Sequence, residues 1–406
     1  MLNSVFVERE TCVNAQNYDP IPIVISHGEG VWLWDVENNR YLDMLSAYSA
    51  ISHGYVHPKI YKALVDQASR VSVCSRAVYH NKMADFLELL CKLLGQDKAL
   101  MMNSGAEAVE TAIKAARRYG YQKKGIANNQ AEIIVMQGNF HGRTLGIISF
   151  STEDAYKKDF GPLLPGFKVV PYGDIDALKD AITPNTCAVL TEPIQGEGGI
   201  IIPPQGWLKS VEILCNENDV LLLVDEIQSG LGRTGRLLTC NHENVKPDIV
   251  ILGKALGGGF LPVSAIVGQE KVMSVFNPGS HGSTFGGNPL ATAVGIAALE
   301  SLVDEQMIEN SDILGRYFLE ALKKIKSPYI TAVRGLGLWI GIDINPDMIK
   351  ARTLCMYLLK EGIIARDTHK ITIRLAPPLI ITKEQIDWAL ERLDKVLTLP
   401  VSCLSV

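Results

Sequence analysis

The stretch that decides the fold is VLLLVDEIQ, residues 220–228, together with IVILGKALGGGF, residues 249–260. Each begins with a short run of Val, Ile and Leu without polar alternation, which is typical of a strand buried on both faces of a parallel sheet. Asp225 follows the first run and Lys254 follows the second. Because ligands of open α/β sheets bind outside the carboxyl ends of the strands, we expect both charges in one crevice.

A carboxylate and an amine in one crevice have two interpretations. The plain one is a salt bridge at the end of a sheet, because Asp after a strand and Lys in a glycine-rich turn are both common. The functional one is that charges carried there by separate buried strands serve a ligand. Pyridoxal phosphate needs this combination, since a lysine holds it covalently and an acidic side chain pairs with its pyridinium nitrogen. The other residues of the crevice decide between the two.

Length and composition indicate an ordinary globular protein. The chain has 406 residues, enough for one large core and a smaller one, because single cores stop growing near ~250–300 residues. It is 47% hydrophobic and 20% charged, and its net charge of -5 gives no electrostatic footprint for nucleic acid. No apolar segment approaches the ~18 residues of a membrane span. We therefore expect neither a nucleic acid nor a membrane as partner.

The N-terminal residues and the cysteines indicate the location of the protein and whether it binds metal. Residues 1–16 contain Glu8 and Glu10 and lack an apolar or arginine-rich leader, which predicts a cytoplasmic protein. The eight cysteines are scattered without a C-x-x-C pair. This pattern indicates reduced thiols, so we expect neither a disulfide framework nor a metal site.

The order of segments predicts two domains. Residues 51–305 alternate between strand-like and helix-like segments, which predicts a large α/β domain with a mostly parallel central sheet. Residues 1–50 contain strand-like segments, and residues 306–406 contain the alternating segment 371–375 and a final helix capped by Thr382. We expect these two end segments to form a smaller α+β domain. Within the large domain we expect helices over 57–71 and 81–94 and strands over 132–136, 168–171, 188–191 and 265–267.

A helix is predicted to begin near Ser104. Ser104 and Glu107 have the spacing of a capping box, which explains the helix start by itself. Gly105 and Ala106 give the helix a small, open N-terminus, and such an N-terminus also binds phosphate through free N–H groups and the helix dipole. The two interpretations are compatible.

Four further side chains have a plain structural interpretation when each is taken alone. Phe140 follows a glycine-rich turn, where an aromatic ring stacks on a ligand or simply packs in the core. Tyr48 beside a strand is ordinarily a packing residue, Glu197 after a strand is ordinarily solvated, and Arg374 is ordinarily exposed on its strand. The loop 279–289 is polar and glycine-rich, with hydroxyls suited to an anion.

Taken together, the motifs resemble the class III pyridoxal phosphate-dependent aminotransferases. They occur in the family's order and spacing over nearly the whole chain: SGAEA (104–108), FHGRT (140–144), EPIQGEGG (192–199), DEIQ (225–228), GKA (253–255) and HGSTFGGNP (281–289). The resemblance implies the α/β architecture of fold type I aminotransferases. It also implies a homodimer with active sites at the subunit interface.

The resemblance also implies the residues that bind pyridoxal 5'-phosphate. Lys254 is the covalent attachment point and, with Asp225, the catalytic pair; Asp225 meets the ring nitrogen. The remaining cofactor residues are the phosphate-binding segment Ser104, Gly105 and Ala106, the ring-stacking Phe140 with its neighbour His141, Gln228 at the ring hydroxyl, and Ser283 and Thr284 from the neighbouring subunit.

Within this family the chain resembles the branch that transfers the δ-amino group of L-ornithine to 2-oxoglutarate. Tyr18 and Tyr48 carry this likeness, because they stand where that branch contacts its substrate. The products would be glutamate 5-semialdehyde and glutamate, which belong to arginine and ornithine breakdown and to proline synthesis. By this likeness Arg374 binds the α-carboxylate of glutamate or 2-oxoglutarate, and Glu197 covers Arg374 when ornithine is bound. Tyr18 and Arg143 would hold ornithine's distant carboxylate. The alternatives are N-acetylornithine or 4-aminobutyrate as amine donor and, more remotely, a non-catalytic pyridoxal-binding protein.

Overall fold

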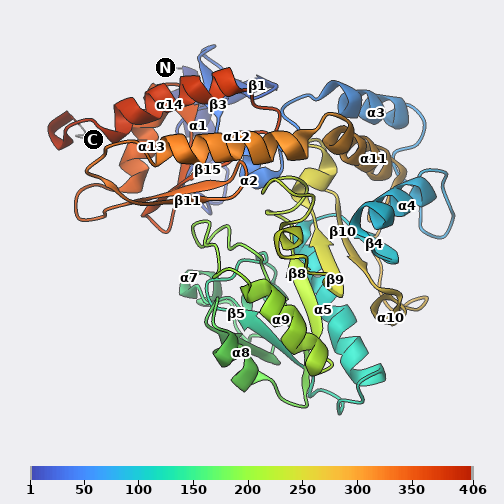
Figure 1. Cartoon of the computed structure of the whole chain (residues 1–406). Helices are drawn as coiled ribbons and strands as arrows, with labels where there is room; N and C mark the ends of the chain where they lie inside the picture. The colour runs from blue at the N-terminus through green and yellow to red at the C-terminus, as the bar shows by residue number, and fades with distance from the viewer. Residues whose placement is uncertain (1, 404–406) are drawn as a thin grey trace.

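The computed structural model describes residues 2–403, which form three sheets with helices packed against them (Figure 1). The largest sheet has seven strands in the order β4-β10-β9-β8-β7-β5-β6. Its strands are β4 (Lys98–Met102), β5 (Glu132–Met136), β6 (Phe167–Val170), β7 (Thr186–Thr191), β8 (Leu221–Asp225), β9 (Ile249–Leu252) and β10 (Ser264–Gly268). Strands β6, β5, β7, β8 and β9 pair in parallel, and β10 runs antiparallel to β4 and β9. The predicted α/β class with a mostly parallel sheet is confirmed.

Helices cover both faces of this sheet. Helix α5 (Gly105–Gln122) packs on one face, and α8 (Ile175–Ala181) and α9 (Trp207–Glu217) pack on the other. Strand β8 is buried along its whole length, because Leu221 and Leu223 join the core under α5 while Leu222 and Val224 join the core under α9. Burial on both faces explains the absence of polar alternation in this run.

Two four-stranded sheets bring the ends of the chain together. One has the order β1-β2-β3-β13 and the other β11-β12-β15-β14. Their strands are β1 (Ile25–Glu29), β2 (Trp32–Asp35), β3 (Arg40–Asp43), β11 (Ile330–Gly335), β12 (Ile340–Ile344), β13 (Ile363–Ile364), β14 (Arg366–Thr368) and β15 (Thr372–Leu375). The parallel pairing of β13 with β3 places N-terminal strands beside C-terminal elements (Figure 1). On this basis we propose that residues 1–50 and 306–406 form the small domain and 51–305 the large one.

The other helices cover the edges of the sheets and the small domain. The α-helices are α1 (Leu2–Thr11), α2 (Ser46–Ser49), α3 (Pro58–Ala68), α4 (Met83–Leu94), α6 (Leu145–Ile148), α7 (Asp154–Lys157), α10 (Glu270–Met273), α11 (Pro289–Asp304), α12 (Met307–Leu322), α13 (Ala351–Lys360) and α14 (Lys383–Leu397). The 3-10 helices are η1 (Thr239–Glu243), η2 (Lys254–Gly257) and η3 (Val401–Cys403). Between residues 2 and 403, no helix is both long and apolar enough to cross a membrane.

The structure differs from the sequence predictions in five places. Helix α3 ends at Ala68 and α4 begins at Met83, so both helices are shorter than predicted, and α1 and β4 were not predicted. The alternation of 371–375 suggested a half-exposed strand, yet every residue of β15 is buried. The reason is tertiary, because β15 lies between β12 and β14 and its Arg374 contacts Gly196 and Glu197, which follow β7.

A buried arginine connects the large sheet to both chain ends. Arg233 donates hydrogen bonds to Leu338 O (3.0 Å), Pro377 O (2.5 Å) and Ser52 Oγ (3.0 Å). The side chain is fully buried, and this burial lowers its pKa to about 9. These acceptors belong to three segments far apart in the sequence, so one guanidinium links all three.

Replacing this arginine should destabilise the whole molecule. Arg233→Met leaves three buried acceptors without their donor, so we expect the free energy of unfolding to fall by about 3 kcal/mol. Urea unfolding followed by circular dichroism measures the change. Arg316→Met is the matched control, because Arg316 is exposed and pairs with Asp312 at the surface. An equal effect of both substitutions would contradict the role of Arg233.

Candidate active site

Asp225 ends β8 at the edge of the central sheet. Its side chain is 5% exposed, and its Oδ2 lies 2.6 Å from His141 Nδ1. Its Oδ1 accepts the backbone N–H of Ile227 at 3.0 Å. Two hydrogen-bond partners hold this buried carboxylate in one orientation, which suits it to pair with a cationic ring nitrogen.

Lys254 lies at the same edge because β9 runs parallel to β8. Asp225 stands opposite Ile251 in the register, and the chain leaves β9 at Leu252, two residues before Lys254. Burial lowers the pKa of Lys254 below its usual value, although the nearby carboxylates of Glu197 and Asp225 oppose that shift. A lowered pKa favours the neutral amine, which is the form that acts as nucleophile and base.

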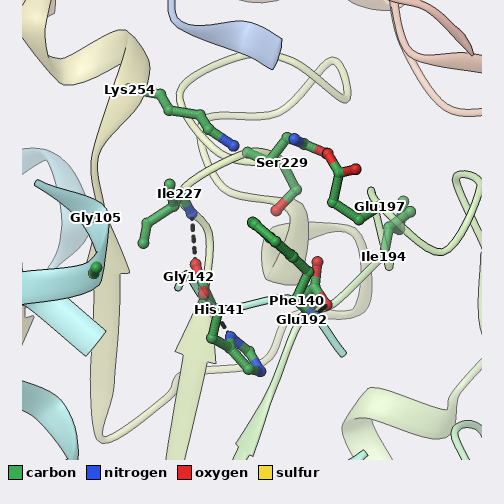
Figure 2. A pocket seen from close by; sticks show the side chains of 13 residues that line it. Gly105, Phe140, His141, Gly142, Glu192, Ile194, Glu197, Ile227, Ser229 and Lys254 are labelled. Atoms are coloured by element: carbon green, nitrogen blue, oxygen red, sulfur yellow. Dashed lines mark hydrogen bonds and ion pairs between the residues drawn. The ribbon is translucent and has the colours of Figure 1, made fainter. Parts of the chain in front are cut away.

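The two residues face one cavity of about 190 Å³. Figure 2 shows the side chains of Lys254, Glu197 and Phe140 around it, with the His141 ring farther from Lys254. The lining residues are Gly105, Ala106, Phe140, His141, Gly142, Glu192, Ile194, Glu197, Asp225, Ile227, Gln228, Ser229 and Lys254. The structure therefore brings together the predicted residues of the α5 N-terminus and of the segments that follow β5, β7, β8 and β9.

The N-terminus of α5 closes one side of the cavity. Ser104 Oγ accepts the N–H of Glu107 at 3.2 Å, and the Glu107 carboxylate accepts the N–H of Ser104 at 2.7 Å, so the predicted capping box is present. The Ser104 side chain serves the cap, while Gly105 and Ala106 line the cavity. A Cβ at Gly105 would lie 3.0 Å from Ile227 Cδ1, so the close approach favours glycine. The helix presents its first N–H groups to an anion here.

Glu192 is a third buried carboxylate, and the sequence analysis assigned it no role. Its oxygens accept the N–H groups of Phe140 (3.0 Å) and Gly196 (3.3 Å). Burial raises its pKa to about 7. The available signal was its position directly after β7, because Thr191 pairs with Val224 and Glu192 therefore stands level with Asp225 at the end of β8. Glu192 thus fixes the backbone of Phe140 and of the turn before Glu197.

Arg374 and Glu197 form an ion pair at the cavity. Arg374 Nη1 lies 2.7 Å from Glu197 Oε1, and Arg374 is only 4% exposed. Burial alone would raise the pKa of Glu197, but the charge of Arg374 holds it below its usual value. The Arg374 guanidinium also lies 4.9 Å from the centre of the Tyr48 ring. The predicted pair is therefore present with the carboxylate covering the arginine.

Tyr48 reaches Arg374 from an unusual backbone. Residues 46–49 all have positive φ, with Tyr48 at 59°, so α2 is a left-handed turn. Left-handed geometry costs about 1–2 kcal/mol per residue for side chains other than glycine. A costly turn that carries a ring to Arg374 is typical of a functional site.

Seven predicted residues are not among those that line this cavity: Ser104, Tyr48 and Arg374, described above, and Arg143, Tyr18, Ser283 and Thr284. Arg143 lies beside it, with its guanidinium 5.6 Å from the Phe140 ring centre. Tyr18 is 79% exposed, and the carbonyl of the next residue, Asp19, accepts a hydrogen bond from Arg366 at 2.8 Å. Ser283 Oγ accepts from Asn103 at 2.9 Å, and Thr284 is exposed.

The donor set fits pyridoxal phosphate. Within the described residues 2–403, two buried atoms of the cavity residues have no hydrogen-bond partner, Gln228 Oε1 and His141 Nε2. Together with the Phe140 ring, the Asp225 carboxylate, the Lys254 amine and the α5 N-terminus, they provide a planar face, an acidic partner, a nucleophile and an anion site. These are the groups that this cofactor requires.

Fold and site together define a pyridoxal phosphate-dependent aminotransferase of fold type I. The family description Aminotransferase class-III matches residues 13–397. The chain belongs to the class III aminotransferase family.

Three comparisons place it within this family. It is 55% identical to the ornithine aminotransferase of Geobacillus sp. strain WCH70, over 94% of this chain and 95% of that one. The crystal structure of ornithine aminotransferase from Toxoplasma gondii ME49 superposes with a TM-score of 0.96 at 41% identity, covering 97% and 94% of the two chains. An acetylornithine aminotransferase from Elizabethkingia anophelis has a TM-score of 0.89 at 45% identity, covering 97% and 98%.

The contact between His141 and Asp225 predicts an unusual titration. Burial alone would lower the pKa of His141, but the hydrogen bond and charge of Asp225 raise it above the usual 6.5. NMR titration of 15N-histidine-labelled, cofactor-free protein should find His141 still charged above pH 6.5. In Asp225→Asn the raising interaction is lost, burial dominates, and the pKa should fall below 6.5. An unchanged pKa in Asp225→Asn would show that the contact does not set the charge of His141.

Proposed function

We propose that the protein transfers the δ-amino group of L-ornithine to 2-oxoglutarate and forms glutamate 5-semialdehyde and glutamate. The observation that carries the proposal is the Arg374–Glu197 pair beside Lys254, since an arginine covered by an internal carboxylate suits a pocket that accepts two different substrates. The similarity to the Geobacillus ornithine aminotransferase supports ornithine as the amine donor. The product semialdehyde would connect arginine and ornithine breakdown with proline synthesis.

Five elements of the chain would hold pyridoxal phosphate. The N-terminus of α5 at Gly105 and Ala106 would bind the phosphate, Phe140 would cover the ring, and Asp225 would pair with the ring nitrogen. Gln228 has a free buried acceptor for the ring hydroxyl, and Lys254 provides the covalent attachment. When bound, the cofactor supplies an electron sink that stabilises negative charge on the carbon next to the substrate nitrogen.

Lys254 is the proton-transfer residue in this proposal. Burial lowers the pKa of its amine, so the neutral form that acts as a base is more accessible than in an exposed lysine. The neighbouring carboxylates of Asp225 and Glu197 stabilise the positive charge that the amine gains with the proton. His141 keeps Asp225 in place through the 2.6 Å contact.

Glu197 and Arg374 would choose between the substrates. An arginine fork binds a carboxylate through two parallel hydrogen bonds, which suits the α-carboxylate of glutamate or 2-oxoglutarate. With Glu197 on Arg374, as in the structure, that α-carboxylate site is occupied and an α-amino acid cannot bind in the productive orientation. Ornithine then enters with its δ-amine toward Lys254, and its own carboxylate would bind Tyr18 and Arg143, with Tyr48 packed against Arg374.

A homodimer is part of the proposal. Tyr79 is 99% exposed, Val78 56% and Phe285 55%, and large apolar patches of this kind mark protein interfaces. The segments are adjacent, because His80 Nε2 lies 2.9 Å from Gly287 O. Ser283 and Thr284 precede Phe285, so burying this patch against a second copy would bring their hydroxyls to the interface, where they would complete the partner's phosphate site.

A cytoplasmic location is also proposed. The structure contains eight free cysteines, of which four are buried. Free thiols in this number suit a reducing compartment.

A different amine donor is the main alternative. The likeness to the acetylornithine aminotransferase of Elizabethkingia anophelis makes N-acetylornithine a realistic donor, and 4-aminobutyrate has the same terminal amine and distant carboxylate. Tyr18 and Tyr48 favour ornithine in our proposal.

Half-reactions distinguish the donors. The cofactor-loaded protein, mixed separately with L-ornithine, N-acetylornithine and 4-aminobutyrate, should lose its visible cofactor absorbance fastest with L-ornithine. The product should behave as the semialdehyde that cyclises spontaneously. Faster conversion by either other donor would replace the proposed substrate and leave the family and Lys254 in place.

Removing the covering carboxylate should change the choice of amine. In Glu197→Ala, Arg374 is permanently free, so kcat/KM for L-glutamate should rise relative to L-ornithine by about tenfold, the equivalent of about 1.4 kcal/mol. Stopped-flow half-reactions measure the ratio. Glu217→Ala, at an exposed position on α9, is the control and should leave it unchanged. An unaltered ratio in Glu197→Ala would rule out the covering role.

A further inference from the structure

We infer that Tyr156 is a specificity-determining residue that positions Arg143 to bind the distant carboxylate of the amine donor. The inference rests on the proposed function, in which Arg143 binds that carboxylate. Tyr156 lies on α7, outside every motif identified in the sequence.

The Tyr156 ring is the closest described support of the Arg143 guanidinium. Arg143 Cζ lies 3.4 Å from the centre of the Tyr156 ring and 5.6 Å from that of Phe140. The two rings are 6.1 Å apart at 82°, an edge-to-face arrangement. Arg143 therefore stacks on one ring while the second ring lines the cavity, which places its charge at the cavity rim.

Arg143 keeps its charge available. Among residues 2–403, no carboxylate lies within ion-pair distance of Arg143, whereas Arg374 is covered by Glu197. A guanidinium stacked on an aromatic face retains its in-plane N–H groups for a carboxylate, because the ring occupies only one face. A flexible, exposed arginine would lose side-chain entropy on binding, and a ring that already orders it reduces that cost.

The backbone around Tyr156 is anchored to the cavity wall. Gly138 N donates to Thr152 Oγ1 at 2.8 Å, and Glu153 N donates to Ser151 Oγ at 3.2 Å. Gly138 belongs to the turn that leads to Phe140. Burial raises the pKa of Tyr156, although the charge of Arg143 opposes that shift, so its hydroxyl stays neutral. The α7 turn thus fixes the ring relative to the cavity.

The sharpest test compares two amines that differ only in the carboxylate. L-ornithine and 1,4-diaminobutane present the same terminal amine, but 1,4-diaminobutane has no carboxylate for Arg143. Tyr156→Leu in the cofactor-loaded enzyme should lower kcat/KM for L-ornithine about tenfold, mainly through KM, and leave that for 1,4-diaminobutane unchanged. Tyr156→Phe retains the ring and should keep the wild-type ratio of the two values.

A double-mutant cycle shows whether Tyr156 acts through Arg143. Arg143→Gln should reduce the same ratio, and adding Tyr156→Leu to it should have no further effect, because the positioned group is already gone. Phe160→Leu is the matched control, since Phe160 is an exposed aromatic residue of the same loop, 59% accessible. Thermal unfolding of each variant reports any general loss of structure.

The outcomes separate this inference from the proposed function. An unchanged ratio in Tyr156→Leu, or equal losses with both amines, would overturn the positioning role while the ornithine reaction of the wild type stands. Additive effects in the double variant would also overturn it. A wild type that does not prefer L-ornithine over 1,4-diaminobutane would instead overturn the assignment of Arg143, and the inference with it.

Discussion

The parallel pairing of β7, β8 and β9 is the constraint on which the active site depends. Asp225 lies opposite Ile251 in the register of β8 and β9, so the chain that leaves β9 delivers Lys254 to the same edge at which β8 ends. The preceding strand, β7, ends directly before Glu192, and β5 ends before the turn that carries Phe140 and His141. In a parallel sheet all carboxyl ends lie on one side. The charged groups that follow these strands therefore lie close together.

Convergence of so many charges in a buried place requires that they offset each other. Asp225 lies against His141 and Glu197 against Arg374, and both pairs are largely removed from solvent. Each pair lowers the cost of burying its members, although such pairs contribute little net stability. Lys254 is different, because among residues 2–403 no carboxylate lies within ion-pair distance of its amine, and burial lowers its pKa. The site therefore places two ion pairs around one amine that has no such partner among the described residues.

Much of the fold and part of the site could be predicted from the sequence, because strand burial and helix capping depend on residues that are near each other in the chain. The apolar run before Asp225 indicated a strand buried on both faces, and the spacing of Ser104 and Glu107 indicated the start of α5. Arg374 was harder, since its strand alternates in sequence but lies in the middle of a sheet that packs against the large domain. Tyr156 could not be predicted at all, because its contact with Arg143 joins a short helix to a turn without any periodic pattern.

The transferred nitrogen is the most direct test of the account. The purified enzyme would be incubated with 2-oxoglutarate and L-ornithine labelled with 15N at the δ position or, in a parallel reaction, at the α position, and the glutamate formed would be analysed by mass spectrometry. With Glu197 covering Arg374 and Lys254 at the reacting end of the cavity, the label should enter glutamate only from the δ position. Label arriving from the α position would contradict the account, because it would mean that Arg374 binds ornithine's own carboxylate.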